Sequence, residues 1–598
     1  MCGIAGVATK SSNAASEVFE GLKRLEYRGY DSAGIAVLHS GSLTAVKRKG
    51  RVATLEVAIG NLCGKVAIGH TRWATHGVPC ERNAHPHICG KIAIVHNGII
   101  ENFRELKKEL EGLTQTYLSD TDSEVVAHLI NYYYSQSGER GLNTLLKAVA
   151  EAVKKLKGSF ALAVLCEDFE GIIAVKSKSN AVVGLGVEGV YLSSDIPALP
   201  AFVDSVIIMQ DGDIAAITAD RVDFFNFNLE SVERVARHIP NVQLTGGKCG
   251  YPHYMLKEIY EGERTVVDTA EAFFNLNLPL LQGLLGSADK IILTGCGTAY
   301  HAALACAKYF EERCNTFCYA EVASELRYKK LNVTKDTLLF VVTQSGETAD
   351  AVGVAEEFKR LGAKVVAVTN CGYSAIMLIA DTVIPVCAGP EICVAATKSY
   401  LGQLAALYLT AALAQGVEVA KQACNELKEV ASHFAEVVND NLSEEFVKDC
   451  VKSRAVFFLG RGYDADVALE ASLKLKEVSY IFSDSYPAGE LKHGTLALID
   501  GETLSILCVG DKSFADKSES TVEQIISRGG RAAVVTNVAE VALSLEGRAK
   551  VWLLPECKPS LFILLSAVAL QLTAYRCAVL LNRDPDKPRN LAKSVTVE

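Results

Sequence analysis

The sequence contains no long run of Lys or Arg and no apolar stretch long enough to span a membrane without polar interruption. Because the 598-residue chain also has a formal net charge of −10, we expect neither nucleic acid nor an anionic membrane as a main partner. The most apolar late stretch, 561–581, is interrupted by Gln571, Thr573 and Arg576. This pattern favours a buried helix over a membrane span.

The sequence also lacks a secretory signal, since no basic region followed by a long apolar core opens the chain. Its 18 cysteines include no Cys-x-x-Cys pair, so we expect free thiols in a cytoplasmic protein. Cys80, His85, His87 and Cys89 have the residue types of a zinc site, but their spacing matches no standard ligand pattern. We therefore expect no metal and no bound cofactor.

The first part of the chain, residues 2–238, mixes short strands with a few helices and predicts an α+β domain. The expected strands lie at 67–68, 92–96, 160–166 and 171–175, and a helix is expected at 123–134. Residues 239–248 are rich in turn formers and lack periodicity, so we interpret them as a linker.

After the linker, strands and helices alternate, which is typical of a parallel α/β sheet. The sequence also repeats itself, because 291–297 is echoed by 456–462 and 362–370 by 529–537. Both echoes are about 165 residues apart and in the same order, which indicates two copies of one domain.

We expect the two copies to divide near Gly416–Glu426. This places the first α/β domain at 249–422 and the second at 423–588. A C-terminal tail follows at 589–598.

Cys2 is the residue that removal of Met1 would expose. The α-amine of a terminal cysteine titrates near neutrality and could act as general base for its own thiol, as in N-terminal nucleophiles. The alternative is an ordinary cysteine at the start of a strand.

Three other segments carry groups suited to amide chemistry. The guanidinium of Arg72 could bind a carboxylate through two hydrogen bonds. The Asn97 amide beside the Gly98 N–H could form an oxyanion hole. Asp122 opens a helix, where it could equally be only a first-turn carboxylate. Each feature taken singly is more often structural than catalytic.

Together these segments closely resemble the class II glutamine amidotransferases. The matching motifs are Cys2-Gly-Ile-Ala-Gly, LEYRGYDSAG at 25–34, HTRWATHG at 70–77, NAHPH at 83–87, HNGIIEN at 96–102 and TDSE at 121–124. The resemblance implies an N-terminal-nucleophile fold, in which two sheets are sandwiched between helices (αββα).

By motif match, the resemblance also assigns roles. Cys2 would attack the glutamine amide, and Asn97 with Gly98 would hold the oxyanion. Arg72 would bind the α-carboxylate of glutamine and Asp122 its α-ammonium group. The pocket would further be lined or supported by Thr75, His76 and His85, with Trp73 where ammonia leaves.

In the first α/β copy, an apolar strand at 338–343 is followed by Gln344-Ser-Gly-Glu-Thr348 and a helix to about residue 361. A glycine-containing turn before a helix presents free N–H groups and the positive helix end to an anion. Thr343, Ser345 and Thr348 add three hydroxyls where plain helix capping would need one, so we predict a phosphate site. The triphosphate-loop pattern GxxxxGK[ST] is absent, and 295–300 lacks the third glycine of a dinucleotide fingerprint.

The second copy does not keep this loop, and its corresponding stretch is read as Cys508–Ser513. It has Glu470, Lys474 and Glu477 on one helical face, which could also be a solvent-exposed stripe of salt bridges. A turn at 488–494 carries an acid, a base and an imidazole.

These segments and the tail at 589–598 resemble the tandem sugar isomerase (SIS) domains of the glucosamine-6-phosphate synthase family. The resemblance covers essentially the whole chain. It implies two parallel-sheet SIS domains, the substrates L-glutamine and D-fructose 6-phosphate, an isomerising amination and a homodimer.

Family roles transfer to matching positions. His493, from the neighbouring subunit, would assist opening of the fructose ring, and Lys593 would form a Schiff base at C2. Glu477 would move a proton between C1 and C2, with Lys474 and Glu470 as polar partners. The phosphate and hydroxyl groups would be bound by Thr298, Thr343, Gln344, Ser345 and Thr348, with backbone contacts from Val394 and Ala592.

Two positions depart from the family pattern, because Ala299 and Ala396 stand where serine is common. Each missing hydroxyl could remove a hydrogen bond of about 0.5–1.5 kcal/mol, which affects affinity more than reaction type. An alternative function is a phosphosugar deglycase or binding regulator, which would not need Cys2, Asn97 and Asp122 on an appended domain. Another class II amidotransferase would need a nucleotide or pyrophosphate site, and none is evident.

Overall fold

The computed structural model describes residues 2–60, 62–74, 76–114, 116–238, 247–372, 374–440 and 442–595. The chain divides into two compact units, residues 1–246 with 594–598 and residues 247–593. Thr75 and residues 239–246 of the predicted linker lie outside the described residues.

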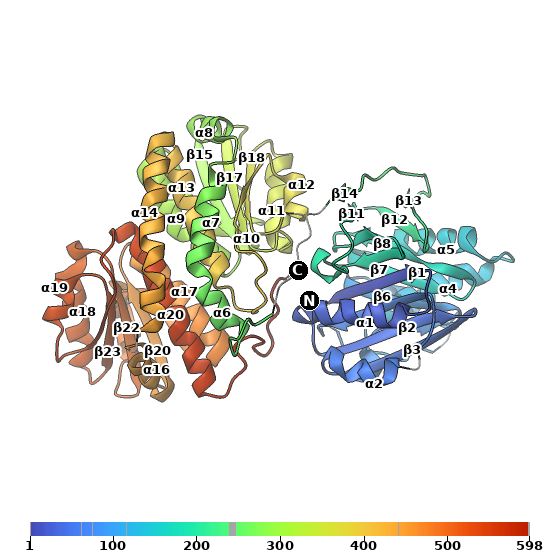
Figure 1. The fold of residues 1–598 in the computed structure, drawn as a ribbon, viewed down its shortest axis with the longest axis horizontal. Helices are drawn as coiled ribbons and strands as arrows, with labels where there is room; N and C mark the ends of the chain where they lie inside the picture. The colour runs from blue at the N-terminus through green and yellow to red at the C-terminus, as the bar shows by residue number, and fades with distance from the viewer. Residues whose placement is uncertain are drawn as a thin grey trace. The chain divides into compact units, whose positions relative to one another are not determined.

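The first unit contains two antiparallel sheets packed face to face (Figure 1). One sheet has the order β14 (Arg237–His238), β11 (Ser205–Ile208), β9 (Val182–Leu185), β10 (Gly189–Ser193), β1 (Gly3–Thr9), β4 (Val66–Arg72), β2 (Ser32–His39) and β3 (Ser42–Lys49). The other has the order β13 (Val222–Asn226), β12 (Asp213–Ile217), β8 (Phe169–Ser177), β7 (Gly158–Cys166), β6 (Ile92–Ile100) and β5 (His87–Cys89). Side chains such as Ile4, Ile68, Val95 and Ile172 fill the space between them.

Helices cover the outer faces of this sandwich. α1 (Ala14–Leu25) packs on β1 and β4, and its buried Val18, Leu22 and Leu25 recur at helical spacing. α4 (Glu124–Gln136) packs on β5 and β6, and α5 (Leu142–Lys155) packs on α4. The short helices are α2 (Glu56–Ile59) and α3 (Phe103–Glu109). This αββα order confirms the fold that the sequence predicted for the first domain.

The second unit contains two five-stranded parallel sheets, as the alternating pattern predicted. The first has the order β16 (Phe317–Val322), β15 (Lys290–Gly295), β17 (Thr337–Thr343), β18 (Lys364–Thr369) and β19 (Thr382–Pro385). The second has the order β21 (Ser483–Pro487), β20 (Ala455–Gly460), β22 (Thr503–Val509), β23 (Arg531–Thr536) and β24 (Lys550–Leu553). The two strand orders are the same, which confirms the duplication.

The helices of the second unit lie on both sides of these sheets (Figure 1). Those of the first half are α6 (Tyr254–Tyr260), α7 (Gly262–Phe273), α8 (Leu278–Ser287), α9 (Thr298–Cys314), α10 (Ala323–Leu326), α11 (Ala349–Arg360), α12 (Ala375–Ile379) and α13 (Lys398–Leu413). Those that follow are α14 (Val417–Ser432), α15 (Phe434–Asn439), α16 (Ser443–Lys452), α17 (Tyr463–Ser479), α18 (Ala515–Ile526), α19 (Ala539–Ser544) and α20 (Pro559–Leu580). The expected division near Gly416–Glu426 falls at the beginning of α14.

One hydrophobic core runs through both halves of the second unit. At its centre lies α20, which packs against α16 and α17. Among the described helices, α20 alone is long and apolar enough to cross a membrane, yet most of it is buried inside the unit. The prediction of a buried helix at 561–581 is therefore confirmed.

The structure corrects the alignment of the two copies at the phosphate loop. Ile291 pairs with Leu338 in the first copy, and its counterpart Val456 pairs with Leu504 in the second. The loop 343–348 therefore corresponds to 509–514, one residue later than the sequence reading of Cys508–Ser513. The reading was wrong because the second copy has one extra residue between these two strands, which a fixed repeat length cannot reveal.

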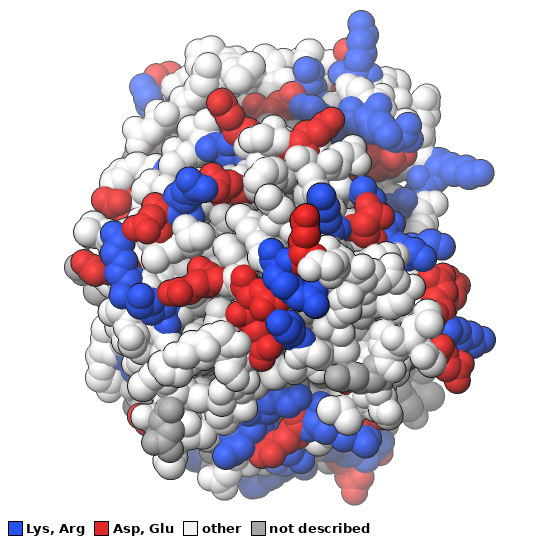
Figure 2. Space-filling model, turned by 90° about the vertical axis from the view of Figure 1, so that its right-hand side faces the viewer, with Lys and Arg blue, Asp and Glu red and all other residues white. Residues whose placement is uncertain are grey.

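Charges of both signs are interspersed on the face drawn in Figure 2, where neither sign covers a large area. The whole chain has 60 Lys and Arg against 70 Asp and Glu. An anionic metabolite must therefore be bound by local groups rather than by a broad basic surface.

Candidate active sites in the two units

The pairing of β1 with β4 brings Cys2 beside Arg72 and Trp73. Gly3 pairs with Thr71 across these strands, so the preceding cysteine lies at the end of β4. The Trp73 N–H donates to Cys2 Sγ at 3.3 Å. Burial raises the pKa of the Cys2 thiol, while the Trp73 N–H and the Arg72 guanidinium oppose this rise. A thiol in this environment needs a base before it can attack a carbonyl carbon.

Asn97 and Gly98 lie in β6, and the backbone there excludes any residue larger than glycine at position 98. Gly98 has φ +133°, and an added Cβ would lie 1.9 Å from the carbonyl oxygen of Ser159. Asn97 is buried, and its Oδ1 lies 3.1 Å from His70 Nε2. The Asn97 side-chain amide and the N–H of the following glycine are donors of the kind that an oxyanion hole uses.

His70 is a residue to which sequence reasoning assigned no role. Its Nε2 also lies 2.9 Å from the carbonyl oxygen of His96, so both partners of this nitrogen are oxygens. Burial lowers the pKa of His70 to about 3, and the ring is therefore neutral with its proton on Nε2. By donating to Asn97 Oδ1, His70 turns the amide NH₂ of Asn97 away from itself. The HTR segment contained this histidine, but only the pairing of distant strands shows its partner.

Arg72 offers an unoccupied donor. Its Nη2 donates to the carbonyl oxygens of His76 and Gly77, the latter at 2.9 Å. Its Nη1 is buried and has no hydrogen-bond partner among the described residues. A buried guanidinium N–H without a partner is costly, so this group fits an incoming carboxylate.

Asp122 is buried near His76. Its Oδ2 accepts from the Ile100 N–H at 2.8 Å, and its Oδ1 lies 3.9 Å from His76 Nδ1. The hydrogen bond from Ile100 therefore holds Asp122 at the end of β6, the strand that also carries Asn97 and Gly98. One carboxylate and one guanidinium in this unit match the two charged ends of an amino acid.

His85 supports the site through packing. Its ring lies 4.1 Å from that of His70 and 4.6 Å from that of His87, centroid to centroid. Burial lowers the pKa of His85 well below its usual range. Trp73 packs edge-on against Tyr30 at 5.7 Å.

In the second unit, the loop after β17 has the shape of an anion site. Gly346 has φ +70°, and its N–H donates to Thr343 Oγ1 at 3.1 Å. Ser345 Oγ accepts from the Glu347 N–H at 3.2 Å. Thr348 is the N-cap of α11 but makes no capping hydrogen bond through its side chain, which argues against the alternative of plain helix capping. The loop thus offers hydroxyls and N–H groups at the positive end of a helix.

Glu470 and Lys474 of α17 are buried and Glu477 is half-buried, so the alternative of a solvent-exposed stripe is wrong. Lys474 Nζ lies 2.6 Å from Glu477 and 3.5 Å from Glu470. Glu470 also accepts from Thr298 Oγ1 at 3.1 Å and contacts His301 Nδ1 at 2.7 Å. Burial alone would lower the pKa of Lys474, but Glu470 and Glu477 outweigh it and raise that pKa above its ordinary value.

His301 was also missed by sequence reasoning. It lies one helical turn after Thr298 on α9, and the two residues meet the same carboxylate on α17. Helical spacing could have put His301 on the face of Thr298, but nothing local could identify Glu470 as the partner.

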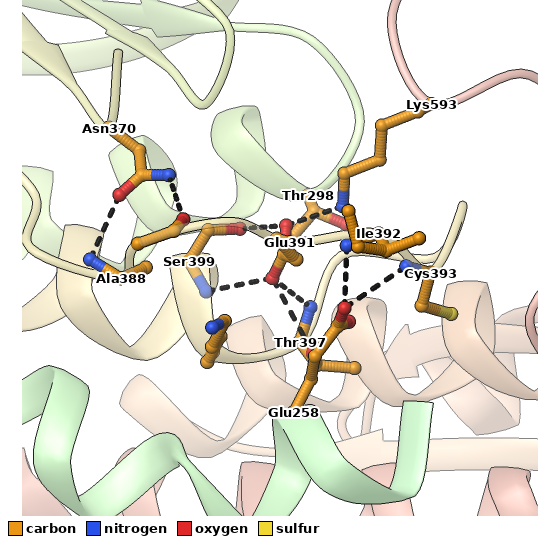
Figure 3. Close-up of polar contacts among 12 residues, drawn as sticks. Glu258, Thr298, Asn370, Ala388, Glu391, Ile392, Cys393, Thr397, Ser399 and Lys593 are labelled. Atoms are coloured by element: carbon orange, nitrogen blue, oxygen red, sulfur yellow. Dashed lines mark hydrogen bonds and ion pairs between the residues drawn. The ribbon is translucent and has the colours of Figure 1, made fainter. Parts of the chain in front are cut away.

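Lys593 is held inside the second unit by Glu391 (Figure 3). The side chains are 4% and 0% exposed. Glu391 also accepts from the N–H groups of Thr397 and Ser399, each at 3.0 Å, and from Ser399 Oγ at 2.7 Å. Burial would raise the pKa of Glu391, but Lys593 and these donors lower it to about 2. Glu391 is therefore an anion that fixes the lysine.

A second buried carboxyl group, Glu258, lies behind this pair (Figure 3). It accepts from the N–H groups of Ile392 at 2.6 Å and Cys393 at 3.1 Å. Burial and the charge of Glu391 raise the pKa of Glu258 to about 8. Sequence reasoning missed both glutamates, because neither lies in a recognisable motif.

The remaining predicted sugar-site residues differ in how deeply they are buried. Val394 is buried, with its N–H donating to the carbonyl oxygen of Asp586 at 3.0 Å, and Ala592 is half-buried beside Lys593 in sequence. His493 is exposed at the end of a short 3-10 turn, Glu490–His493. No hydrogen bond or ion pair joins His493 to the other predicted sugar-site residues in the described part of the chain.

Comparison with known proteins gives the same two-part organisation. A model of the glutamine amidotransferase domain matches residues 70–200, and a model of the SIS domain matches residues 284–413 and 450–581. The C-terminal domain of glucosamine-fructose-6-phosphate aminotransferase from Francisella tularensis is 31% identical, with a TM-score of 0.54 over 57% of this chain and 99% of that one. Tagatose-6-phosphate ketose/aldose isomerase from Escherichia coli, 16% identical with a TM-score of 0.50, covers 58% of this chain and 96% of its own, and it shares the fold alone.

Full-length relatives share much more of the sequence. The glutamine–fructose-6-phosphate aminotransferase (isomerizing) of Clostridium tetani is 39% identical over 618 residues, which cover 100% of both chains. The protein of the same description from Caldanaerobacter subterraneus subsp. tengcongensis is 40% identical over 618 residues, again covering 100% of both. With this similarity over its whole length and both domain types in the same chain, the protein belongs to the family of glutamine–fructose-6-phosphate aminotransferases (isomerizing).

Proposed function

We propose that this enzyme takes ammonia from L-glutamine and uses it to convert D-fructose 6-phosphate into glucosamine 6-phosphate and glutamate. The observation that carries the proposal is the presence of both sets of groups on one chain, an amide-cleaving set in the first unit and a phosphosugar set in the second. A deglycase or a binding regulator would not need the first set.

In the first unit, Cys2 Sγ attacks the side-chain carbonyl carbon of glutamine. The oxyanion forms against the Asn97 amide and the Gly98 N–H. The C–N bond then breaks, ammonia leaves, and water hydrolyses the thioester to give glutamate. Arg72 Nη1 and Asp122 bind the two ends of glutamine. The pocket is completed by Thr75, His76 and His85, with Trp73 at the exit for ammonia.

In the second unit, the phosphate binds to the loop that begins at Thr343. Its partners are Thr343, Gln344, Ser345 and Thr348, with Thr298, Val394 and Ala592 next to the sugar. Because the phosphate does not react, the loop binds and orients the sugar and takes no part in the chemical steps.

Lys593 adds its amine to C2 of the opened sugar and expels water to form a Schiff base, which ammonia then displaces. Glu391 places the lysine and balances its charge until it loses its proton. Glu477 moves a proton between C1 and C2, with Lys474 and Glu470 as its partners. His493 opens the ring from the neighbouring subunit, so the enzyme works as a homodimer.

We further propose that the enzyme is cytoplasmic and needs neither metal nor organic cofactor. Its domains are residues 2–238, 249–422 and 423–588, with a linker at 239–248 and a tail at 589–598. The family relationship supports these domains, and the absence of any redox step in the reaction supports the proposal that no cofactor is needed.

The test is an assay with glutamine and fructose 6-phosphate, without ATP, that measures glutamate and glucosamine 6-phosphate. Cys2→Ala should abolish glutamine-dependent synthesis, whereas synthesis from high ammonium should persist. Cys63→Ala, which changes an exposed cysteine, is the matched control. No glucosamine 6-phosphate from the unaltered enzyme would reject the proposal, and glutamine-dependent synthesis by Cys2→Ala would reject the nucleophile.

A further inference from the structure

The second SIS copy keeps part of the backbone around the phosphate loop. Gly297 and Gly462 precede α9 and α17 with nearly equal angles, φ +55° and ψ −127° against φ +58° and ψ −127°. In the loop, Ser345 Oγ accepts from the N–H two residues later, and its counterpart Asp511 Oδ1 does the same with the Ser513 N–H at 2.8 Å. The two loops share this turn but differ after it, because Gly346 has φ +70°, whereas its counterpart Lys512 begins a 3-10 helix, Lys512–Phe514.

The side chains of the two loops also differ. The three hydroxyl residues of the first loop, Thr343, Ser345 and Thr348, are replaced in the second by Val509, Asp511 and Phe514. None of the replacements can donate a hydrogen bond to a phosphate, and Asp511 brings a carboxylate where the first copy has a hydroxyl donor.

A further carboxyl group accepts a hydrogen bond from the backbone of the second loop. Asp464, the counterpart of Ala299, accepts from the Gly510 N–H at 2.8 Å through its Oδ2. This N–H corresponds to that of Gln344 in the first loop, where Ala299 has no oxygen to offer. Asp464 is 3% exposed, and burial raises its pKa to about 8.

Lack of space is not what distinguishes the second copy. A cavity of about 300 Å³ lies at this place. Its lining includes the acidic side chains of Glu311, Glu312, Asp464 and Asp511 and the basic side chains of Lys308 and Arg461. The charge of Lys308 is already engaged, since its Nζ contacts Asp466 at 2.5 Å and the carbonyl oxygen of Gly462 at 2.7 Å.

We propose that Asp464, together with Asp511, is the determinant that keeps phosphosugars out of the second copy, so that each chain binds one fructose 6-phosphate. The Asp464 oxygen takes the backbone N–H that a phosphate oxygen would need, and Asp511 repels the anion. This inference rests on the proposed phosphate site of the first copy.

Exchange of these residues between the copies tests the inference. Ala299→Asp should block the first loop and weaken fructose 6-phosphate binding at least about tenfold, since one strong hydrogen bond is lost. Ala299→Ser, which restores the residue common in the family, is the matched control and should keep binding. The glutaminase activity reports that each variant is folded.

In the second copy, Asp464→Ala with Asp511→Ser should raise the number of fructose 6-phosphate molecules bound per chain from one to two in equilibrium dialysis, with synthesis unchanged. Asp464→Asn retains an oxygen for the Gly510 N–H and should still bind one fructose 6-phosphate per chain. If the double variant also binds only one fructose 6-phosphate per chain, or if Ala299→Asp binds fructose 6-phosphate as tightly as the unaltered enzyme, the inference is wrong. If the unaltered enzyme binds no fructose 6-phosphate, the proposed function fails instead.

Discussion

At the scale of single residues, the orientation of the Asn97 amide depends on His70. Neutral His70 has one N–H on Nε2, and this group points at two oxygens. An amide can be turned by 180° at little cost in water, but the fixed donor leaves only one orientation with a hydrogen bond. We therefore propose that His70 positions the Asn97 amide for the proposed oxyanion hole.

We expect His70→Leu to lower the glutaminase kcat about 10- to 100-fold, somewhat less than the roughly 10²–10³-fold loss that follows removal of an oxyanion donor itself. The KM for glutamine should change little, because Arg72 and Asp122 still bind the substrate ends. Steady-state kinetics measure both values. His70→Gln retains an N–H donor and should recover part of kcat. A loss confined to KM, or no recovery with Gln, would contradict the positioning role.

Among the elements, the beginning of α11 is where we propose that strand, turn and helix bind the phosphate. Ser345→Ala and Thr348→Val should each raise the KM for fructose 6-phosphate about tenfold or more, since hydrogen bonds to charged groups contribute roughly 1.5–3 kcal/mol. Glutaminase kinetics should stay the same. Ser513→Ala in the equivalent loop of the second copy is the control. An unchanged KM in both variants would place the phosphate elsewhere.

The loop before α13 provides a second test, through its two buried glutamates. Glu391 is ionised and Glu258 carries a proton at pH 7, because their pKa values lie at about 2 and about 8. Glu391→Gln removes the charge that pairs with Lys593, whereas Glu258→Gln resembles the form already present. We expect Glu391→Gln to lower the kcat of synthesis at least about tenfold and Glu258→Gln to lower it little.

The same pair of variants has a readout besides activity. The tail should detach when Lys593 loses its partner, and trypsin should then cut faster after the exposed Arg589. The fragment is followed by mass spectrometry. Equal cleavage of Glu391→Gln and Glu258→Gln would show that the ion pair does not hold the tail.

At the scale of the whole molecule, the two reactions must share one intermediate. Free ammonia is protonated near neutral pH and loses its nucleophilicity, so transfer from Cys2 to the sugar has to avoid bulk water. Trp73→Ala should let ammonia escape. We expect the ratio of glutamate to glucosamine 6-phosphate to lie near one for the unaltered enzyme at saturating fructose 6-phosphate, and well above one for the variant. A ratio that stays near one would remove Trp73 from control of the transfer.

Much of the fold follows from local pattern. Short apolar runs predicted β6 and β7, helical spacing predicted α17, and two echoes in the same order revealed the duplicated sheets. The phosphate loop could be identified because its strand, glycine turn and hydroxyls are contiguous. The residues assigned by family resemblance are predictions, which the variants described above test.

The order of the domains and the segments that carry reactive groups can therefore be predicted from the chain alone, because both depend on neighbouring residues. Which side chains meet depends on the three-dimensional packing. Glu391 and Lys593 are 202 residues apart, and Asp464 and Gly510 are 46 apart. Such contacts arise when packing of the sheets and helices buries polar groups that then require partners, and no local spacing encodes that choice.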